Sequence, residues 1–177
     1  RSVGPALLLH PNTDLDLRLW AEYADFDYYE LSPDAQDRDG TIARAGLDVR
    51  WLFAKDWTAR PYLVYWNYRA DGDDYDHYAV GFGTKVTAPE FIGCEFTLAL
   101  SLVLARYDHP HSLSEDGESR RDTRFSLGLQ VKLKFLEKAL GFVPSLSVNY
   151  EKWASNIGAF DFDRFGIGGS ADILALS

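Results

Sequence analysis

The sequence has no methionine, a single cysteine and no long apolar run, and each of these absences narrows the class of protein. The lone Cys94 cannot form an intrachain disulfide and argues against a cysteine-based metal site. No apolar run approaches the roughly 18 residues of a transmembrane helix, although membrane-spanning strands stay possible because they are short and only half apolar. Since the chain starts at Arg1 without methionine, we expect a processed or excised segment whose export signal has been removed.

Basic residues are also scarce. The chain has 18 Lys and Arg against 27 Asp and Glu, which gives a formal net charge of −9. No basic run is present, so a nucleic-acid partner is not expected. Aromatic residues are abundant at 15%, and the 10 Tyr and 5 Trp among them suit a surface that is apolar on one side and wet on the other.

The clearest pattern present is an unbroken alternation from Arg124 to Phe135. Odd positions are apolar and even positions are polar or small, which predicts a strand with one apolar face. The same alternation recurs along the chain and predicts strands at roughly 3–10, 15–29, 41–54, 60–70, 77–88, 95–107, 121–136, 143–153 and 160–173. The only helical feature expected is a turn at residues 135–140, before Gly141.

The two faces of these strands differ in composition. One face is apolar. On the two strands with the most regular alternation, we expect its side chains to contact lipid: Leu98, Leu100, Leu102, Leu127, Leu129 and Val131. The strand at 60–70 is predicted to add Tyr62, Val64, Trp66 and Tyr68 to this face. The other face combines Gly, Ala and Ser with Arg, which suits a crowded lumen better than a surface in bulk water.

These patterns predict an all-β fold, an antiparallel up-and-down meander β-barrel of roughly 8–10 strands that spans a membrane of the outer-membrane type. We expect residues 1–177 to form a single domain, either a whole barrel or a fragment of a larger one. The alternative is a soluble antiparallel barrel or sandwich with one solvated face.

Polar positions on the inward face are predicted to line the lumen. They are Arg18, Arg44, Asp48, Arg50, Arg69, Lys85, Arg124, Gln130, Lys132, Lys134, Asn149, Glu151 and Arg164. With Asp16, Glu22 and Asp172 added, nine cations face five carboxylates, so the lumen should be net positive and favour anions. Lys132 and Lys134 are the residues expected to set that preference, unless the charges pair across strands and only brace the barrel.

The connections alternate in length. Short ones lie at 11–14, 55–59, 89–94 and 137–142, and longer polar ones at 30–40, 71–76, 108–120 and 154–159. Outer-membrane barrels combine short periplasmic turns with longer outer loops, so each set should lie at one end. Nine strands would leave the two termini at opposite ends. Either residues 3–10 are therefore not a spanning strand, or further strands precede Arg1.

No constellation predicts catalysis or a cofactor. The loop with His109, His111, Ser112, Ser114 and Asp116 reads as a solvated polar segment, because a nucleophile and its base need a fixed geometry. The acidic group of Asp71, Asp73, Asp74 and Asp76 lacks the glycine and glutamate spacing of a calcium-binding EF-hand loop. We therefore expect no enzyme, no metal and no cofactor.

An ordered series of short motifs runs through residues 121–170. It comprises Arg121-Asp122, a Gly141-x-x-Pro144 turn, Tyr150, Ser155-Asn156-Ile157, and an aromatic-x-aromatic-x-Arg strand that ends at Arg164. This series resembles the C-terminal barrel of the surface lipoprotein assembly modifier family (Slam-type outer-membrane proteins). Family members usually add an N-terminal helical-repeat domain and end their last strand in an aromatic residue, and neither feature is present here.

The resemblance implies a barrel in the bacterial outer membrane that assists the delivery of lipoproteins to the cell surface. We therefore expect a non-enzymatic protein of transport or translocation, with outer-membrane lipid and a lipoprotein or anionic cargo as partners. Two alternatives stay open: a small porin-like or structural outer-membrane barrel, and a soluble β-barrel that binds a small apolar ligand.

Overall fold

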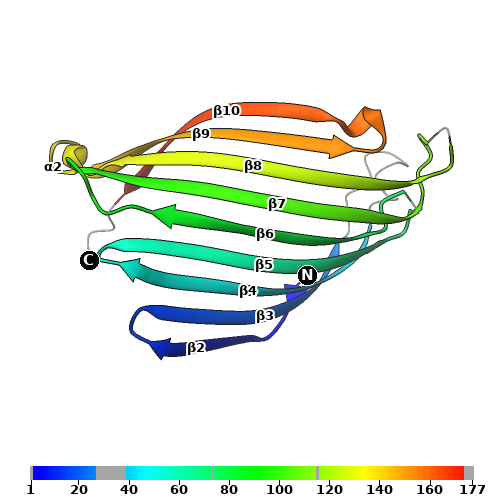
Figure 1. Cartoon of the computed structure of the whole chain (residues 1–177), viewed down its shortest axis with the longest axis horizontal. Coiled ribbons are helices and arrows are strands. Elements are labelled where there is room, and N and C mark those ends of the chain that lie inside the picture. Colours follow the sequence, from blue (N-terminus) through cyan, green and yellow to red (C-terminus); the bar gives the residue numbers. More distant parts are fainter. Residues whose placement is uncertain (1, 27–38, 73, 115, 174–177) are drawn as a thin grey trace.

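A computed structural model describes residues 2–26, 39–72, 74–114 and 116–173 and folds them into one antiparallel sheet (Figure 1). Its strands are β1 (Ser2–Val3), β2 (Ala6–Asn12), β3 (Leu15–Phe26), β4 (Gly40–Ala54), β5 (Trp57–Ala70), β6 (His77–Thr87), β7 (Cys94–Pro110), β8 (Ser119–Leu133), β9 (Phe142–Ser155) and β10 (Phe162–Ile173). The all-β prediction is confirmed, and the predicted strands match the observed ones to within a few residues. Residues 27–29 of the strand predicted at 15–29 lie outside the described residues.

The sheet is a meander in which each strand from β3 to β10 pairs with the next one in sequence. β1 and β2 both pair with β3, one after the other, so together they form a single edge strand interrupted at Gly4 and Pro5. β10 forms the other edge. Within the described residues no pairing joins β10 to β1 or β2. The closed barrel is therefore not found, and the sheet is open.

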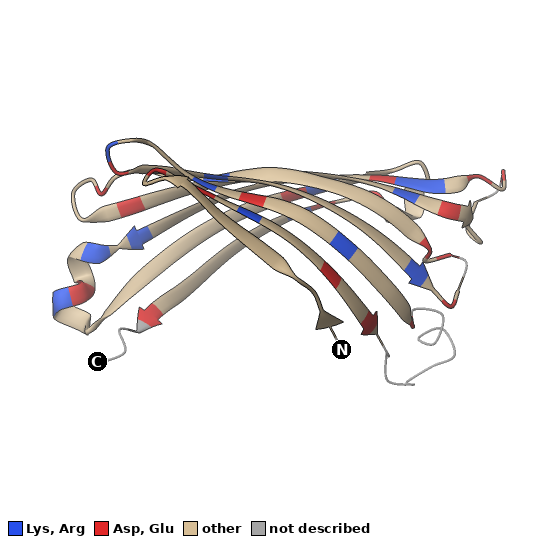
Figure 2. Cartoon of the chain, turned by 90° about the horizontal axis from the view of Figure 1, so that it is seen from below, with Lys and Arg blue, Asp and Glu red and all other residues tan. Residues whose placement is uncertain are grey.

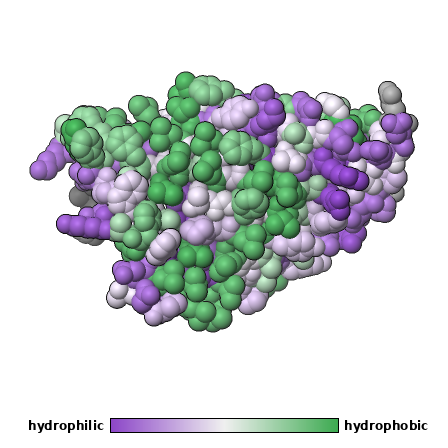
Figure 3. Space-filling view, in the orientation of Figure 1, coloured by the Kyte–Doolittle hydropathy of each residue, from purple (hydrophilic) through white to green (hydrophobic). Residues whose placement is uncertain are grey.

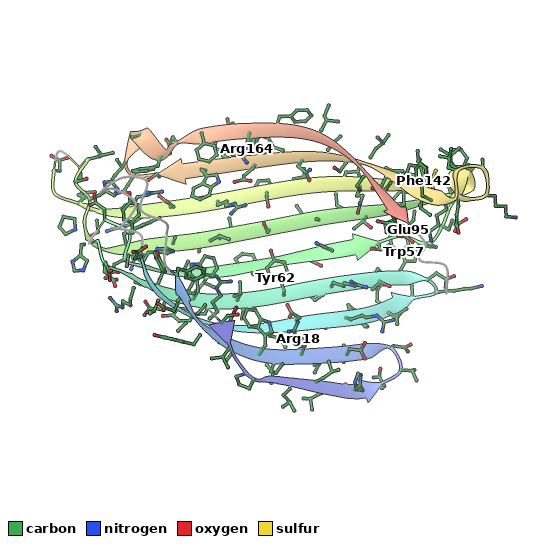
Figure 4. All side chains as sticks on the ribbon, turned by 180° about the vertical axis from the view of Figure 1, so that it is seen from behind. Arg18, Trp57, Tyr62, Glu95, Phe142 and Arg164 are labelled. Carbon is green, nitrogen blue, oxygen red and sulfur yellow. The ribbon has the colours of Figure 1, made fainter. Side chains whose placement is uncertain are left out.

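The open sheet is strongly twisted and curved, so the strands at its two edges cross at a large angle (Figure 2). Seen from behind, the C-terminal end of β10 bends over the concave side (Figure 4). An ion pair of 2.7 Å between Lys132 Nζ on β8 and Asp172 Oδ2 on β10 crosses the intervening strand β9 on this side. The curvature thus gives the sheet a concave face and a convex face.

Short connections gather at one end of the sheet. The last of them contains η1 (Lys134–Leu136) and α2 (Glu137–Leu140), and α2 ends at Gly141 with φ 74°, a left-handed conformation that favours glycine. The predicted helical turn is confirmed. A third short helix, η2 (Gly158–Phe160), lies at the other end, and the described residues contain no helix long and apolar enough to cross a membrane.

The longer loops meet at the opposite end. The backbone N–H of Ser112 donates to Asp74 Oδ1 at 2.8 Å, and Asn156 Nδ2 donates to the carbonyl oxygen of Ser119 at 3.1 Å. The prediction that alternate connections share an end is therefore confirmed for the described loops. Most of the predicted loop at 30–40 lies outside the described residues.

The register fixes which side chains share a face. Leu98 lies opposite Leu129 and Leu100 opposite Leu127, so the apolar rows of β7 and β8 coincide as predicted. The assignment of β5 is wrong, because Leu47 lies opposite Leu63 and Asp48 opposite Tyr62. The row of Tyr62, Val64, Trp66 and Tyr68 therefore shares its face with the charged residues.

A single irregularity explains this error. The pairing of β4 with β5 shifts by one residue between Leu52 and Ala54, next to the short turn at 55–56. Without that shift Leu47 would face Val64, as the sequence suggested. A one-residue shift moves every later side chain to the other face of the sheet, and a β-bulge of this kind leaves no clear mark in the hydrophobic pattern.

Little of this sheet is buried. The buried apolar residues are small or near the ends (Ala24, Ile42, Ala79, Val143 and Ile157), and no large side chain among the described residues is fully buried. Within the described residues, neither face is covered by a second layer of strands or helices. The stability of the fold in any solvent therefore depends on what lies against these two faces.

Candidate functional site

The concave side carries the charges and is called the polar face below. It presents the even-numbered residues of β3, β4, β5, β8 and β10 and the odd-numbered residues of β6, β7 and β9, as the strand register requires. Arg18, Tyr62 and Arg164 are labelled on this side in Figure 4. All predicted lumen residues except Arg69 lie on this face.

Most cations of the polar face are paired with carboxylates from other strands. The N–O distances are 3.8 Å for Arg18–Asp48, 3.7 Å for Arg44–Glu22, 2.8 Å for Arg50–Asp16, 3.0 Å for Arg124–Glu151, 2.7 Å for Lys132–Asp172 and 2.7 Å for Lys134–Glu95. Every carboxylate that was predicted to face inward is used in this way. These pairs join neighbouring and next-nearest strands of the sheet, and Lys132 and Lys134 each have a carboxylate partner.

The neutral polar residues continue this network. Gln130 Nε2 donates to Ser145 Oγ at 3.2 Å, and the hydroxyls of Ser145 and Ser170 lie 2.7 Å apart. Asn149 lines a hollow together with Tyr62 and Lys85. Strands β8, β9 and β10 are thereby joined by side chains as well as by backbone hydrogen bonds.

Arg69 and its neighbour Asn67 are not on the polar face. Arg69 lies opposite Thr41, on the same side as Leu63 and Tyr65, because the bulge in β4 turns β5 over. Its guanidinium binds Asp108 Oδ2 at 2.8 Å and Asp76 Oδ2 at 3.5 Å near the long-loop end. The prediction of Arg69 as a lumen residue is therefore wrong.

The bulge also places on the polar face a residue that the sequence analysis did not predict there. Arg60 lies on the polar face, directly opposite Lys85 on β6. Neither side chain has a carboxylate within 4.0 Å among the described residues, and Arg164 on β10 is a third cation without such a partner. Pairing β4 with β5 residue by residue from the turn at 55–56 would have placed Arg60 on the polar face only if the bulge had been recognised.

Three adjoining hollows mark the polar face. The first is bordered by Arg124, Asn149 and Arg164, the second by Arg18, Asp48 and Arg50, and the third by Glu95, Gln130 and Lys132. Lys85 lines all three hollows, Arg60 lines the second and third, and Tyr62 lines the first and second. Arg60 and Lys85 therefore stand where the hollows meet, whereas Arg164 borders only the first hollow.

Glycines make room for bulky rings on this face. A Cβ on Gly83 would lie 2.7 Å from the Tyr62 hydroxyl, and one on Gly46 would lie 2.6 Å from the ring of Trp20. On β6, the absence of a side chain at Gly83 therefore leaves room for the Tyr62 ring. Further along β5, Trp66 Nε1 donates to His77 Nε2 at 3.1 Å.

A compact cluster closes the long-loop end of the polar face. Arg120 and Asp122 are only 7% and 5% exposed and form a two-point ion pair, with Arg120 Nε 2.9 Å from Asp122 Oδ1. The guanidinium lies over the rings of Tyr107 and Phe160, at 4.6 and 3.4 Å from their centroids. The partner of Asp122 is therefore Arg120, not the adjacent motif residue Arg121.

Most of the other motif positions lie at or beside turns. The Arg121 backbone N–H donates to Asn156 Oδ1 at 2.6 Å, and the Ile157 N–H donates to Ser155 Oγ at 3.2 Å at the long-loop end. Gly141 and Pro144 lie at the short-turn end, whereas Arg164 stands on β10 opposite Glu151. These contacts give most motif positions a role in shaping the connections.

The described part of the histidine- and serine-containing loop shows no hydrogen bond between a serine hydroxyl and a histidine ring. The Ser112 hydroxyl donates to the Asp74 carboxylate, and the buried His111 ring packs against Phe160 with centroids 5.0 Å apart. Burial raises the pKa of Asp74, but the side-chain and backbone hydrogen bonds from Ser112 outweigh it and hold this pKa below its usual value of 3.8. Among the described residues, no three His, Cys, Asp or Glu side chains lie close enough together to hold a metal ion. Asp73, a member of the acidic group at 71–76, lies outside the described residues.

The convex side is the apolar face. Exposed aliphatic side chains fill its middle, among them Leu19, Leu63, Val80, Leu98, Leu100, Leu129, Leu146, Val148 and Ile167 (Figure 3). Aromatic rings flank this band. Trp51, Phe53 and Trp57 pack together at the short-turn end, with centroids 5.4 and 6.0 Å apart, and Tyr23, Tyr65, Tyr78, Phe125 and Phe165 are exposed towards the long-loop end.

No protein-family model matches this chain, and no curated protein matches it in sequence.

Proposed function

We propose that this chain forms part of the wall of a transmembrane β-barrel in the bacterial outer membrane. The observation that carries the proposal is the apolar face, an exposed aliphatic band bordered by aromatic rings at both ends. On β4 the band runs from the row of Ala43 to Trp51, about 27 Å along the strand. With strands tilted by about 40° this spans roughly 20 Å, close to the apolar band of about 25 Å on outer-membrane barrels.

A soluble fold would need to cover this band. Leu63, Leu146 and Ile167 are exposed by 50%, 57% and 76%, although all three are aliphatic and lie in mid-strand. Soluble monomers rarely expose a continuous apolar patch larger than a few hundred Å². Lipid would cover the band without a second protein layer, and the hollows on the opposite, charged face do not suit a small apolar ligand.

The open edges fit a wall that other strands complete. Every step from β2 to β10 is antiparallel, and these two edge strands therefore run in the same direction. A ring closed by antiparallel pairing needs an odd number of further strands between them. Added to β1/β2 as one strand and β3 to β10, an odd number gives the even total typical of bacterial outer-membrane barrels.

We further propose transport or translocation as the activity, with the polar face lining a water-filled path. The resemblance of the motif series to Slam-type proteins suggests surface lipoproteins as the cargo. The proposed activity is transport without catalysis. The ion-paired bracing of the polar face favours one second candidate, a small porin-like or structural barrel whose lumen is crowded by its own side chains.

The proposal is tested by insertion into membranes. The urea-unfolded chain, diluted into lipid vesicles, should regain strand circular dichroism and float with the vesicles. Protease added outside should then cut at only one end of the sheet, within either the long-loop set or the short-turn set. A chain that stays folded, monomeric and monodisperse in buffer without lipid or detergent would contradict the membrane assignment.

A further inference from the structure

We propose that Arg60 and Lys85 form a binding site for the oxyanion group, phosphate or carboxylate, of a water-soluble solute. This inference rests on the proposed function, because it requires the polar face to border water. The two residues lie directly opposite each other on β5 and β6. Like charges directly opposite on neighbouring strands repel, so an anion between them would relieve the repulsion.

The site is distinguished by what its cations lack. Arg18, Arg44, Arg50, Arg124, Lys132 and Lys134 each have a carboxylate within 4.0 Å from another strand or turn. No carboxylate lies within that distance of Arg60 or Lys85 among the described residues. The uncompensated charge of the polar face is therefore concentrated at this pair, with Arg164 across the first hollow, and not at Lys132 and Lys134 as the sequence suggested.

The surroundings of the pair offer space and hydrogen-bond donors. Lys85 lines three hollows, the third of which has a volume of about 650 Å³, large enough for a small solute. Thr58 and Thr87 lie opposite each other beside the pair and line the same hollow, and Tyr62 lines the other two with Lys85. Asp56, Glu90 and Glu95 also border the third hollow. Lys134 holds Glu90 and Glu95 at 3.7 and 2.7 Å, and Asp56 forms no ion pair with Arg60 or Lys85 among the described residues.

The chemistry of the two side chains selects the ligand class. A guanidinium presents N–H donors in a fork that matches two oxygens of a carboxylate or phosphate, and an ammonium adds a compact point charge. Both cations lie on the face opposite the apolar band, so the anionic group belongs to a solute in the aqueous path and not to a lipid in contact with the outer wall.

Inorganic phosphate is the probe for the test, titrated calorimetrically into the protein refolded in a phosphate-free detergent at constant ionic strength. Wild type should bind phosphate saturably. Arg60→Gln together with Lys85→Gln should weaken this binding by about tenfold or more, because charge-assisted hydrogen bonds are lost. Lys132→Gln is the matched control, since it removes a cation of the same hollow that Asp172 already neutralises, and its affinity should stay within about twofold of wild type.

The outcomes separate this site from the proposed function. The proposed site would be contradicted if the double variant and Lys132→Gln lost phosphate affinity equally, or if the wild type showed no saturable phosphate binding. Either result would count against the site even if the chain inserts into vesicles. Selective loss in the double variant would support the site, and failure to insert into vesicles would then count only against the membrane proposal. If the double variant does not fold, the two single variants should each weaken phosphate binding while Lys132→Gln does not.

Discussion

At the scale of single residues, the most strongly fixed charges are Arg120 and Asp122. Both are buried and face one another through two hydrogen bonds, while two aromatic rings cover the guanidinium. Replacing Asp122 by Ala would leave Arg120 buried and unpaired, which should cost about 3 kcal/mol in the free energy of unfolding. Urea titration in detergent measures this cost. Asp48→Ala, which breaks an exposed pair of 3.8 Å, should cost less than about 1 kcal/mol, and equal costs would contradict the account.

A second residue-scale prediction concerns pH. Because the pKa of Asp74 lies below 3.8 in the folded protein, its contact with Ser112 is present at neutral pH and is lost as the pH falls through that lowered value. Protease cleavage in the loop at 111–118 should therefore accelerate in acid. Asp74→Ala should give the fast rate already at pH 7. If cleavage of this variant still accelerates in acid as much as that of wild type, Asp74 does not control the loop.

At the scale of elements, the positions of the strands in the sequence were far more predictable than the face of the sheet on which each side chain lies. The alternation in β7 and β8 is unambiguous because one face is Leu and Phe and the other Ser, Gly and Lys, and both strands lie as expected. In β5 both faces are rich in large apolar residues, so the pattern could not reveal the bulge that sets its side. One unseen bulge was enough to add Arg69 to the predicted site and to hide Arg60.

The faces of β8 allow a matched test at this scale. Leu129 and Gln130 are neighbours on opposite faces, opposite Leu98 and Thr97 of β7. Leu129→Arg should destabilise the protein in lipid vesicles by about 2–4 kcal/mol, because the charge would enter the hydrocarbon layer, whereas Gln130→Arg should cost far less. Unfolding by urea from vesicles gives both values. Similar costs for the two substitutions would show that neither face is in lipid.

At the scale of the whole molecule, the sequence predicted the meander and left open whether the chain forms a whole barrel or a fragment of one. Local alternation specifies each hairpin, while closure depends on a pairing between β10 and strands far away in sequence, which no local pattern encodes. For the charges, the sequence likewise predicted only how many cations and carboxylates share the polar face, not which of them form ion pairs. Which cations are neutralised follows from the register, and this is why the uncompensated charge lies at Arg60 and Lys85 instead of Lys132 and Lys134.

We propose that the convex face contacts lipid and the concave face contacts water, and spin labels on the two faces test this directly. In a Cys94→Ser background, a spin label attached at Leu129→Cys or at Gln130→Cys reports its surroundings in vesicles by electron paramagnetic resonance. The account predicts that the label at 129 collides mainly with dissolved oxygen, which concentrates in lipid, and the label at 130 mainly with a water-soluble nickel complex. Labels at both positions that collide equally with the nickel complex would contradict it.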